Sequence, residues 1–400
     1  MPLLNPHFDD LRTEYIFPII EQKLESLKAK AGQVINLGIG DVALPLVPKI
    51  ISTICEATQE MGIKERMRGY GPSTGYNFLK EAIAAHDYAS LNISPDEIFI
   101  SDGINSDAVN IQDLFSPEIT IAICNPTYPA YLDASLMNGR KSQITFLPLK
   151  EENRFSPALP ETPVDLVYLC SPNNPIGTAM TKKELKTWVD WARKNSAILV
   201  YDNAYMAFIT SPDVPKSIFE IEGAKEVAIE LRSFSKTAGF TGLRCGYCVL
   251  PKSVKGLLNG KLVPLHPLWT RRQNVKSNGV AYPIQKGALA VYTPEGQKQT
   301  KEQIQVYLSA GKILREGLLE QGHSVYGGHD APYLWWKVTE GLTSWQFFDL
   351  LLEQCQILGI PGIGFGSAGE GYIRLSCFTT PEIAQEAVLR IYAIESNAVL

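Results

Sequence analysis

Lys236 is the residue of this sequence best suited to covalent chemistry. It stands in the segment "SFSKTAGFTGLRCGY" (residues 233–247), between small hydroxyl residues and directly after an apolar run, with Arg244 eight positions downstream. A lysine amine becomes a nucleophile when burial and neighbouring cationic groups lower its pKa. A lone lysine in such a segment is more often a surface residue, so its meaning depends on what the fold places around it.

The elements that must position Lys236 form a repeating pattern between residues 98 and 250. Short apolar runs, rich in β-branched residues, alternate with helical patterns. The runs are "EIFIS" (97–101), "ITIAIC" (119–124), "VDLVYLC" (164–170), "AILVYD" (197–202), "EVAIEL" (226–231) and "CGYCVL" (245–250). Strands that are apolar on both faces and alternate with helices predict a mostly parallel sheet covered by helices on both sides. The spacing of Thr181 and Glu184 predicts that one helix begins with a capping box.

Distinctive polar segments follow five of these runs. They are "SDGINSD", "NPTYPAY", "SPNNPIG", Asp202 with "NAY", and "RSFSK". Because ligands bind beyond the carboxyl ends of the strands in an open parallel sheet, we expect these segments to build one ligand site. Each segment alone has an ordinary explanation, such as a turn for "NNP" or a helix cap for Asp202. Their order and placement together favour the site.

One end of this site suits a phosphate group. The glycine turn before Ile104 and Asn105 predicts a helix N-terminus, where free backbone N–H groups and the helix dipole favour an anion. The hydroxyl groups of Ser233 and Ser235 and the guanidinium of Arg244 would bind the same phosphate.

The other end suits an aromatic aldehyde. Asp202 would balance a buried cationic ring nitrogen, and Tyr128 would stack on the ring. Asn174 would donate a hydrogen bond to a ring oxygen. Lys236 would form a Schiff base with the aldehyde carbon. Pyridoxal 5'-phosphate meets all of these requirements, and we expect it as the cofactor.

The motifs carry a resemblance to a known family. "SPNNPIG", "YDNAY" and "SFSKTAGFTGLRCGY", in this order, resemble the fold-type I pyridoxal-phosphate aminotransferases. Within that group, "NPHFDDLRTEYIF", "VINLGIGD", "RGYGPSTGY", "SDGINSD", "APYLWWKV" and "PGIGFGSAGEGYIRLS" are similar to the LL-diaminopimelate aminotransferases, and the similarity spans nearly the whole chain. The resemblance implies an α/β fold: a large domain with a mostly parallel seven-stranded sheet flanked by helices, and a smaller α+β domain.

The resemblance also implies an activity. The enzyme would interconvert LL-2,6-diaminopimelate and 2-oxoglutarate with tetrahydrodipicolinate, glutamate and water, a step of lysine and peptidoglycan-precursor biosynthesis. Its partners would be small amino acids and 2-oxo acids. The family forms homodimers with shared active sites, so a homodimer is implied here.

The resemblance also implies a role for each residue of this sequence that matches a site position of the family. The catalytic residues would be Lys236, which holds the cofactor and carries the proton, Asp202, which pairs with the ring nitrogen, and Tyr128, which stacks on the ring. The cofactor-binding residues would be Tyr70 from the second subunit, Ile104, Asn105, Tyr128, Asn174, Asp202, Tyr205, Ser233, Ser235, Lys236, Arg244 and Asn278. The substrate-binding residues would be Tyr15, Gly40, Asn105, Tyr128, Asn174, Asn278 and Arg374, the last holding the α-carboxylate.

One position departs from the family pattern. The family typically has Asp-Gly-Ala-Lys where this chain has Asp102, Gly103, Ile104 and Asn105. An amide donates hydrogen bonds but lacks the charge that attracts a carboxylate. An aminotransferase of the same fold with another amino acid substrate therefore stays open. A decarboxylase or lyase is a weaker alternative, because a carboxylate held by Arg374 is not placed for loss.

The overall composition excludes several classes of partner. The formal net charge is -5 and no long basic block occurs, which argues against nucleic acid and anionic membranes as partners. We find no secretory signal and no apolar run of about 18 residues. Seven cysteines scattered through apolar stretches suggest reduced thiols in the cytoplasm, and the CxxC of Cys245 and Cys248 suggests buried strand residues. The five histidines show no metal-ligand spacing, so we expect no catalytic metal.

The pattern along the chain predicts its division into domains. Residues 1–45 would form an N-terminal arm and part of the small domain, residues 46–284 the large cofactor-binding domain, and residues 285–400 the small domain. In the last part, strands "APYLWWKV" and "GYIRLSCF" flank a helix "SWQFFDLLLEQCQIL", and a final helix opens at Thr380-Pro381.

Overall fold

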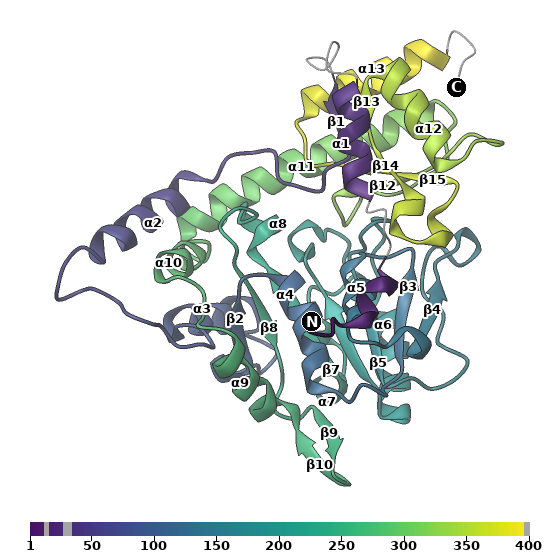
Figure 1. Cartoon of the computed structure of the whole chain (residues 1–400). Coiled ribbons are helices and arrows are strands. Elements are labelled where there is room, and N and C mark those ends of the chain that lie inside the picture. The colour runs from purple at the N-terminus through teal and green to yellow at the C-terminus, as the bar shows by residue number, and fades with distance from the viewer. Residues whose placement is uncertain (12–15, 27–33, 396–400) are drawn as a thin grey trace.

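A seven-stranded sheet forms the centre of the chain in the computed structural model, which describes residues 1–11, 16–26 and 34–395 (Figure 1). Its strands are β2 (Ile98–Ser101), β3 (Ile121–Asn125), β4 (Ile144–Pro148), β5 (Leu166–Cys170), β6 (Ile198–Asp202), β7 (Ala228–Ser233) and β8 (Gly246–Val249). They lie in the order β2-β8-β7-β6-β5-β3-β4. Strand β8 is antiparallel to both of its neighbours, and all other pairs in this sheet are parallel. The five strands that are followed by polar motifs, β2, β3, β5, β6 and β7, therefore end at the same edge.

Alternate residues of each central strand enter two different cores. In β5, Val167 and Leu169 belong to one buried cluster, whereas Leu166 and Tyr168 belong to the other. Successive side chains of a strand point to opposite faces, so a strand buried on both faces must be apolar throughout. The continuous apolar runs in the sequence correctly predicted this sheet.

Helices cover both faces of this sheet, and further helices pack around the smaller sheet described next (Figure 1). They are α1 (Ile16–Ser26), α2 (Pro48–Glu60), α3 (Asn77–Asp87), α4 (Ile104–Asn110), α5 (Ala130–Met137), α6 (Lys182–Asn195), α7 (Ala224–Val227), α8 (Phe234–Ala238), α9 (Leu265–Lys276), α10 (Tyr282–Ala290), α11 (Pro294–Glu320), α12 (Ser344–Leu350) and α13 (Pro381–Glu395). The predicted capping box of α6 is confirmed: Glu184 N donates to Thr181 Oγ1 at 3.3 Å, and Thr181 N donates to Glu184 Oε2 at 2.7 Å.

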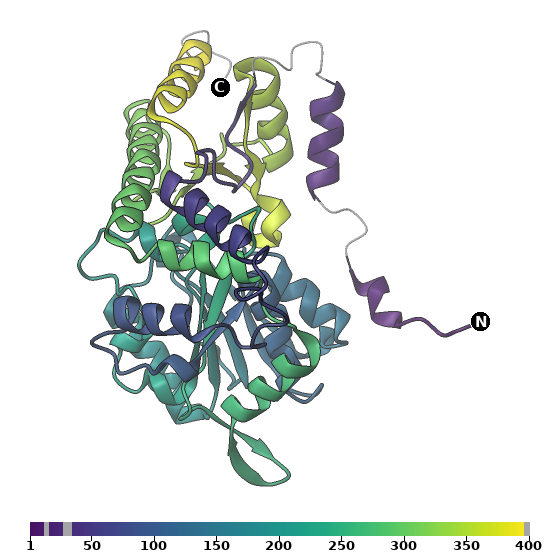
Figure 2. The same cartoon turned by 90° about the vertical axis from the view of Figure 1, so that its left-hand side faces the viewer.

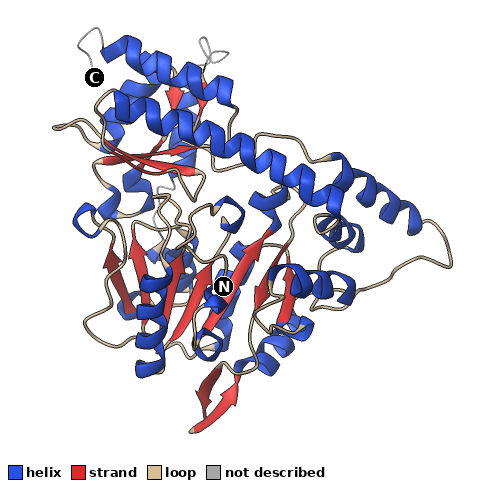
Figure 3. Cartoon of the chain, turned by 180° about the vertical axis from the view of Figure 1, so that it is seen from behind, coloured by secondary structure: helices blue, strands red, loops and turns tan. Residues whose placement is uncertain are grey.

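A second, smaller sheet packs beside the long helix α11, in the upper left of Figure 3. Its antiparallel strands are β11 (Val325–Gly327), β12 (Tyr333–Lys337), β15 (Tyr372–Ser376) and β14 (Ile360–Pro361). The N-terminal segment joins this part, because β1 (Ile35–Asn36) pairs in parallel with β13 (Ile357–Leu358). The proposed domain limits at residues 45 and 284 stay a prediction.

The first residues lie along one side of the molecule (Figure 2). The turn at Pro6–Asp10 is held against α5, since Asn5 Nδ2 donates to Met137 O at 3.1 Å. In α1, Lys23 Nζ donates to Asp349 Oδ1 of α12 at 2.6 Å. The start of the chain is therefore attached to both parts of the fold.

Local sequence patterns misplaced a few elements. The helix expected over 344–358 ends its regular part at Leu350, continues as a π-helical turn to Cys355, and gives way to β13. Residues 226–227, expected to begin a strand, belong to α7. The hairpin of β9 (Lys255–Leu258) and β10 (Lys261–Pro264) was not anticipated. Among the described residues no helix is both long and apolar enough to cross a membrane.

Candidate active site

Lys236 lies in the short helix α8, immediately after β7. The helix begins at Ser233, whose hydroxyl accepts a hydrogen bond from Ser235 N at 3.0 Å, and ends at Gly239 with φ 78°. This cap and this stop confine the helix to a single turn at the sheet edge. The ammonium of Lys236 donates to Gly40 O and lies 5.2 Å from the centre of the Phe378 ring.

The surroundings of Lys236 favour its neutral amine. Burial, aided by the positive charges of Arg374 and Arg244, lowers the pKa of Lys236 to about 8, against the opposing effect of Asp41. The Asp41 carboxylate is 4.0 Å from the amine but half exposed, so water screens its charge. The alternative that Lys236 is a surface lysine is therefore wrong.

Asp202 ends strand β6 and is only 5% exposed. Its carboxylate accepts hydrogen bonds from the Tyr131 hydroxyl and, at 3.1 Å, from Ala204 N. Burial raises the pKa of Asp202 to about 6, although both hydrogen bonds work in the opposite direction. No cationic side chain of the described residues forms an ion pair with it, so a positively charged ligand atom would find an uncompensated partner here.

Arg374 is also buried, at 3% exposure. Its Nη1 donates to Asn174 Oδ1 and its Nη2 to Gly38 O, both at 2.7 Å. The Tyr333 and Phe365 rings lie 4.6 and 4.7 Å from the guanidinium. Its Nε is buried without a hydrogen-bond partner among the described residues, so this cation retains the capacity to bind an anion.

A second cationic position lies at the N-terminus of α4. Gly103, with φ 127°, precedes the helix, and a Cβ at this position would lie 2.7 Å from Arg244 Nη2. Only glycine combines this backbone angle with such a close approach. In the described structure no hydrogen bond uses the N–H groups of Ile104 and Asn105. A guanidinium beside two free backbone donors forms a cradle that suits a phosphate.

These groups line a single cavity of about 380 Å³. Of the predicted site residues it is lined by Gly40, Ile104, Asn105, Tyr128, Asn174, Asp202, Tyr205, Ser233, Ser235, Lys236, Arg244 and Arg374. An amine, an uncompensated acid and an anion cradle thus surround one space, and this arrangement fits pyridoxal 5'-phosphate. Tyr70 and Asn278 are exposed and do not reach the cavity of their own chain. Tyr15 lies outside the described residues.

Sequence reasoning missed several lining residues. Tyr131 supplies the hydrogen bond to Asp202, and its position three residues after Tyr128 was an available signal. The hydroxyl of Tyr333 lies 3.0 Å from that of Tyr205 and would be only 2.4 Å from a Cβ at position 40, which explains Gly40. Nothing in "APYLWWKV" distinguishes Tyr333 from an ordinary strand tyrosine.

The CxxC motif plays no part in this cavity. Cys245 and Cys248 are both fully buried, as predicted, and none of the seven cysteines forms a disulfide.

Comparison with known proteins gives a consistent result. Residues 32–391 match the family model for aminotransferases of class I and II. The chain is 48% identical to LL-diaminopimelate aminotransferase of Parabacteroides distasonis, over 98% of this chain and 99% of the relative. It is 45% identical to the enzyme of that name from Methanosphaera stadtmanae, with the same coverage. Among solved structures, L,L-diaminopimelate aminotransferase from Chlamydomonas reinhardtii superimposes with a TM-score of 0.92 at 40% identity, covering 98% of both chains.

Proposed function

The chain belongs to the class I and II aminotransferases and, within them, to the LL-diaminopimelate aminotransferases, and from this membership we propose how its residues perform the reaction. The cofactor is pyridoxal 5'-phosphate. The substrates are LL-2,6-diaminopimelate and 2-oxoglutarate, and the products are tetrahydrodipicolinate, glutamate and water. The observation that carries the residue roles is the placement of Lys236, Asp202 and Arg374 around one cavity.

The bound cofactor supplies an aldehyde for the substrate amine and an electron-withdrawing ring. Lys236 holds it covalently at rest. Once released, the Nζ of Lys236 would take the proton from the substrate Cα and hold it for return. In the cofactor-free chain the pKa of Lys236 is lowered in the direction that this task requires, because a general base works best when its pKa is near the working pH.

Asp202 would hold the ring nitrogen, and its negative charge would keep that nitrogen protonated. A buried carboxylate without a cationic partner is stabilised by a positive ligand atom, and in turn stabilises the charge on that atom. Tyr131 and Ala204 N fix the carboxylate in place. Asn174 and Tyr205 would bind the ring oxygen and Tyr128 would stack on the ring. Ser233, Ser235, Arg244 and the N–H groups of Ile104 and Asn105 would hold the phosphate.

Arg374 binds the α-carboxylate of the substrate. Asn174 and Gly38 O orient its guanidinium, which leaves Nε and the open side of the group for a carboxylate. Gly40 also lines the cavity. Tyr15 and Asn278 stay proposals as further substrate contacts.

A substitution at Asn105 tests whether this position recognises the distal part of the substrate. Its Oδ1 accepts a hydrogen bond from the Tyr128 hydroxyl at 3.2 Å, so the amide is held at the cavity wall. We expect Asn105→Lys to retain transamination and to lower KM for LL-diaminopimelate more than for glutamate. An equal change for both donors would show that position 105 does not discriminate between them.

We further propose a homodimer with shared active sites. Tyr70 is 93% exposed in the single chain, and Ile63 and Met67 of the same segment are exposed as well, so this segment presents apolar surface. Such a patch favours contact with another protein surface. Tyr70 of one subunit would bind the cofactor phosphate of the other.

Mixing two impaired variants tests this arrangement. Tyr70→Ala and Lys236→Ala are each expected to lose activity, and their co-refolded mixture is expected to recover part of it. Recovery arises because a mixed dimer contains one site with both native residues. A mixture no more active than its components would contradict shared sites.

A cytoplasmic location is proposed from the cysteines. All seven are free, and burial raises the pKa of Cys124 to about 12, so its thiol is unreactive. Labelling intact cells with a membrane-impermeant thiol reagent should leave the exposed Cys55 unmodified.

The first experiment is a half-reaction. LL-diaminopimelate or glutamate is added to the purified, cofactor-loaded protein and the cofactor absorbance is followed. Both donors are expected to convert the cofactor to its amine form. Conversion by glutamate alone would contradict the diaminopimelate assignment while leaving transamination intact.

A further inference from the structure

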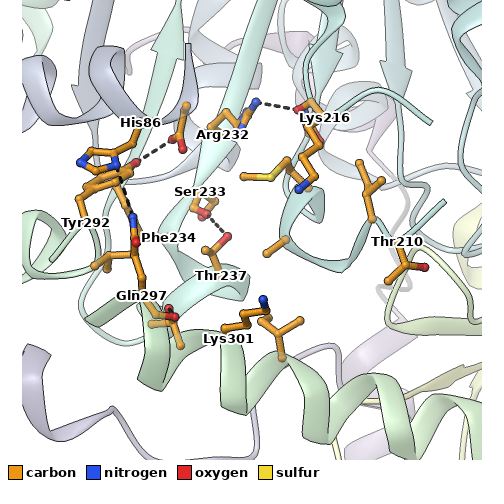
Figure 4. Close-up of a pocket in the computed structure, with 18 of the residues that line it drawn as sticks. His86, Thr210, Lys216, Arg232, Ser233, Phe234, Thr237, Tyr292, Gln297 and Lys301 are labelled. Atoms are coloured by element: carbon orange, nitrogen blue, oxygen red, sulfur yellow. Dashed lines mark hydrogen bonds between the residues drawn. The ribbon is translucent and has the colours of Figure 1, made fainter. Parts of the chain in front are cut away.

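A second cavity, of about 680 Å³, is drawn in Figure 4. It lies on the other side of β7 from the cofactor site. Strand β7 divides the two, because Ile229 and Leu231 face one core whereas Glu230 and Arg232 point to the opposite face. The walls of this cavity are α8, the first half of α11 and the chain between residues 203 and 216. The transamination residues proposed above make no use of this space, apart from Ser233 at its edge.

A buried guanidinium at this cavity has unused hydrogen-bonding capacity. Arg232 is 3% exposed and lines the space. Its Nη2 donates to Lys216 O at 2.7 Å, and its Nε lies 3.5 Å from Glu230 Oε2 without a hydrogen bond. In the described part of the chain its Nη1 has no hydrogen-bond partner. A buried donor left in this way favours an acceptor supplied by a ligand.

Two lysines add positive charge from opposite walls. The ammonium groups of Lys216 and Lys301 both point into the space (Figure 4). Neither has an ion-pair partner among residues 1–11, 16–26 and 34–395. The lining acid Asp87 already accepts hydrogen bonds from the Tyr247 and Tyr292 hydroxyls, at 2.6 and 2.7 Å. Arg232, Lys216 and Lys301 carry three positive charges, against one negative charge on Asp87 and one on Glu230, the ion-pair partner of Arg232, so the cavity has a local excess of one positive charge.

The rest of the lining suits a short carbon skeleton. Met206, Ile304 and Leu308 provide apolar surface. Thr210 and Thr237 also line the space, with their hydroxyls donating to Asp330 Oδ1 at 3.1 Å and to Ser233 O at 3.3 Å. A cavity of this volume is in the range of small-molecule sites, in which a few polar groups orient an otherwise apolar contact.

We propose that this cavity binds a small organic anion that carries two acid groups, carboxylate or phosphate. One acid group would lie between Lys216 and Arg232, and the other would reach Lys301. Thr237 lies next to Lys236 in α8, so the bound anion would contact the helix that carries the reactive lysine.

Calorimetric titration of the cofactor-loaded protein tests the proposal. Citrate serves as the carboxylate probe, pyrophosphate as the phosphate probe, and acetate as a single-acid control. We expect saturable binding of citrate or pyrophosphate and none of acetate at the same concentration. Lys216→Met and Lys301→Met should each weaken binding about tenfold, as expected for the loss of one charged hydrogen bond. Both variants should keep the wild-type kcat in the absence of the anion.

Two controls distinguish binding in this cavity from binding in the active site and from non-specific electrostatic attraction to surface lysines. Lys183→Met removes an exposed lysine of α6 that does not line the cavity, and should not change binding. Arg374→Ala removes the substrate carboxylate contact and should also leave binding intact. Binding of citrate alone or of pyrophosphate alone supports the proposal and identifies the acid group. Failure of both probes, binding that survives both lysine variants, or binding lost in Arg374→Ala would overturn it.

Discussion

Asp202 and Glu230 lie on neighbouring strands of the same sheet, and both are buried, yet their surroundings are opposite. Asp202 has hydrogen bonds from Tyr131 and Ala204 N and no cationic partner among the described residues. Glu230 is fully buried and lies 3.5 Å from Arg232 Nε. It also accepts hydrogen bonds from Tyr88, Asn203, Ser217 and Ile218 N.

The difference shows how a functional buried acid is distinguished from a structural one. The protein neutralises Glu230 internally, whereas it leaves Asp202 for a cation that only a ligand supplies. Burying an uncompensated charge reduces stability, so such a group is retained where it acts on a ligand. Register places the two on opposite faces, since Tyr201 pairs with Glu230 and Asp202 with Leu231.

Asp202→Asn is the change with the largest expected effect on activity. Loss of the charge at the ring nitrogen should lower kcat/KM about 10³-fold, in the range seen when one preorganised electrostatic group is removed. The cofactor-free variant should be at least as stable as the wild type at pH 7. Steady-state kinetics and urea unfolding measure both quantities, with exposed Asp190→Asn of α6 as the control. A variant that unfolds more easily with unchanged kcat/KM would make Asp202 a structural residue like Glu230.

Glu230→Gln should show the reverse pattern. Removing the charge leaves Arg232 buried without its ion-pair partner, which should reduce the free energy of unfolding by about 3 kcal/mol. The kcat of the folded, cofactor-loaded variant should stay within a few-fold of wild type. Urea unfolding measures the free energy of unfolding, and a kinetic assay at saturating substrate on the same preparation measures kcat. A fall in kcat comparable to that of Asp202→Asn would break the comparison.

The pH dependence of stability provides a third test. The pKa of Asp202 is about 6 in the folded state, against an ordinary value of 3.8. Between these values the folded protein keeps a proton that the unfolded chain loses, so cofactor-free stability falls as the pH rises from about 4 to 6. The loss is complete above pH 6 and is on the order of 3 kcal/mol. Asp202→Asn lacks it, so its stability relative to wild type should increase over that interval. A difference that stays constant with pH would contradict the raised pKa.

Tyr131→Phe should have the smallest of these effects. It removes one hydrogen bond to Asp202 and should lower kcat/KM about tenfold. Tyr168→Phe is the matched control. Tyr168 is equally buried and stacks on Tyr131 at 4.9 Å, but its hydroxyl bonds to Gln112 and Ala108 O. Equal losses of kcat/KM in the two variants would show that the Tyr131 effect is packing alone.

Much of the large domain was predictable because its signals are local. A strand buried on both faces shows as a continuous apolar run, and a helix start shows as Thr181 with Glu184. Once the strands are parallel, the segments after them must meet at one edge. Lys236, Asp202 and Asn174 could therefore be placed together before any contact was known.

The small domain was harder, because distant pairing decides its elements. Residues 357–358 continue a helical pattern, yet they form a strand where β1 supplies backbone partners from more than 300 residues away. The hydrogen bonds gained with that partner outweigh local helix propensity.

The sequence by itself determined the mostly parallel sheet, the cofactor class and the residues at the strand ends, since all three follow from short-range patterns. Only the tertiary structure decided that Arg374 is buried against Asn174, 200 positions away, and that Tyr131 and Tyr333 complete the cavity. Only the tertiary structure showed that buried Glu230 has Arg232 as a cationic partner, whereas Asp202 has none among the described residues. Burial and charge compensation depend on groups brought together from distant parts of the chain, and no local pattern encodes them.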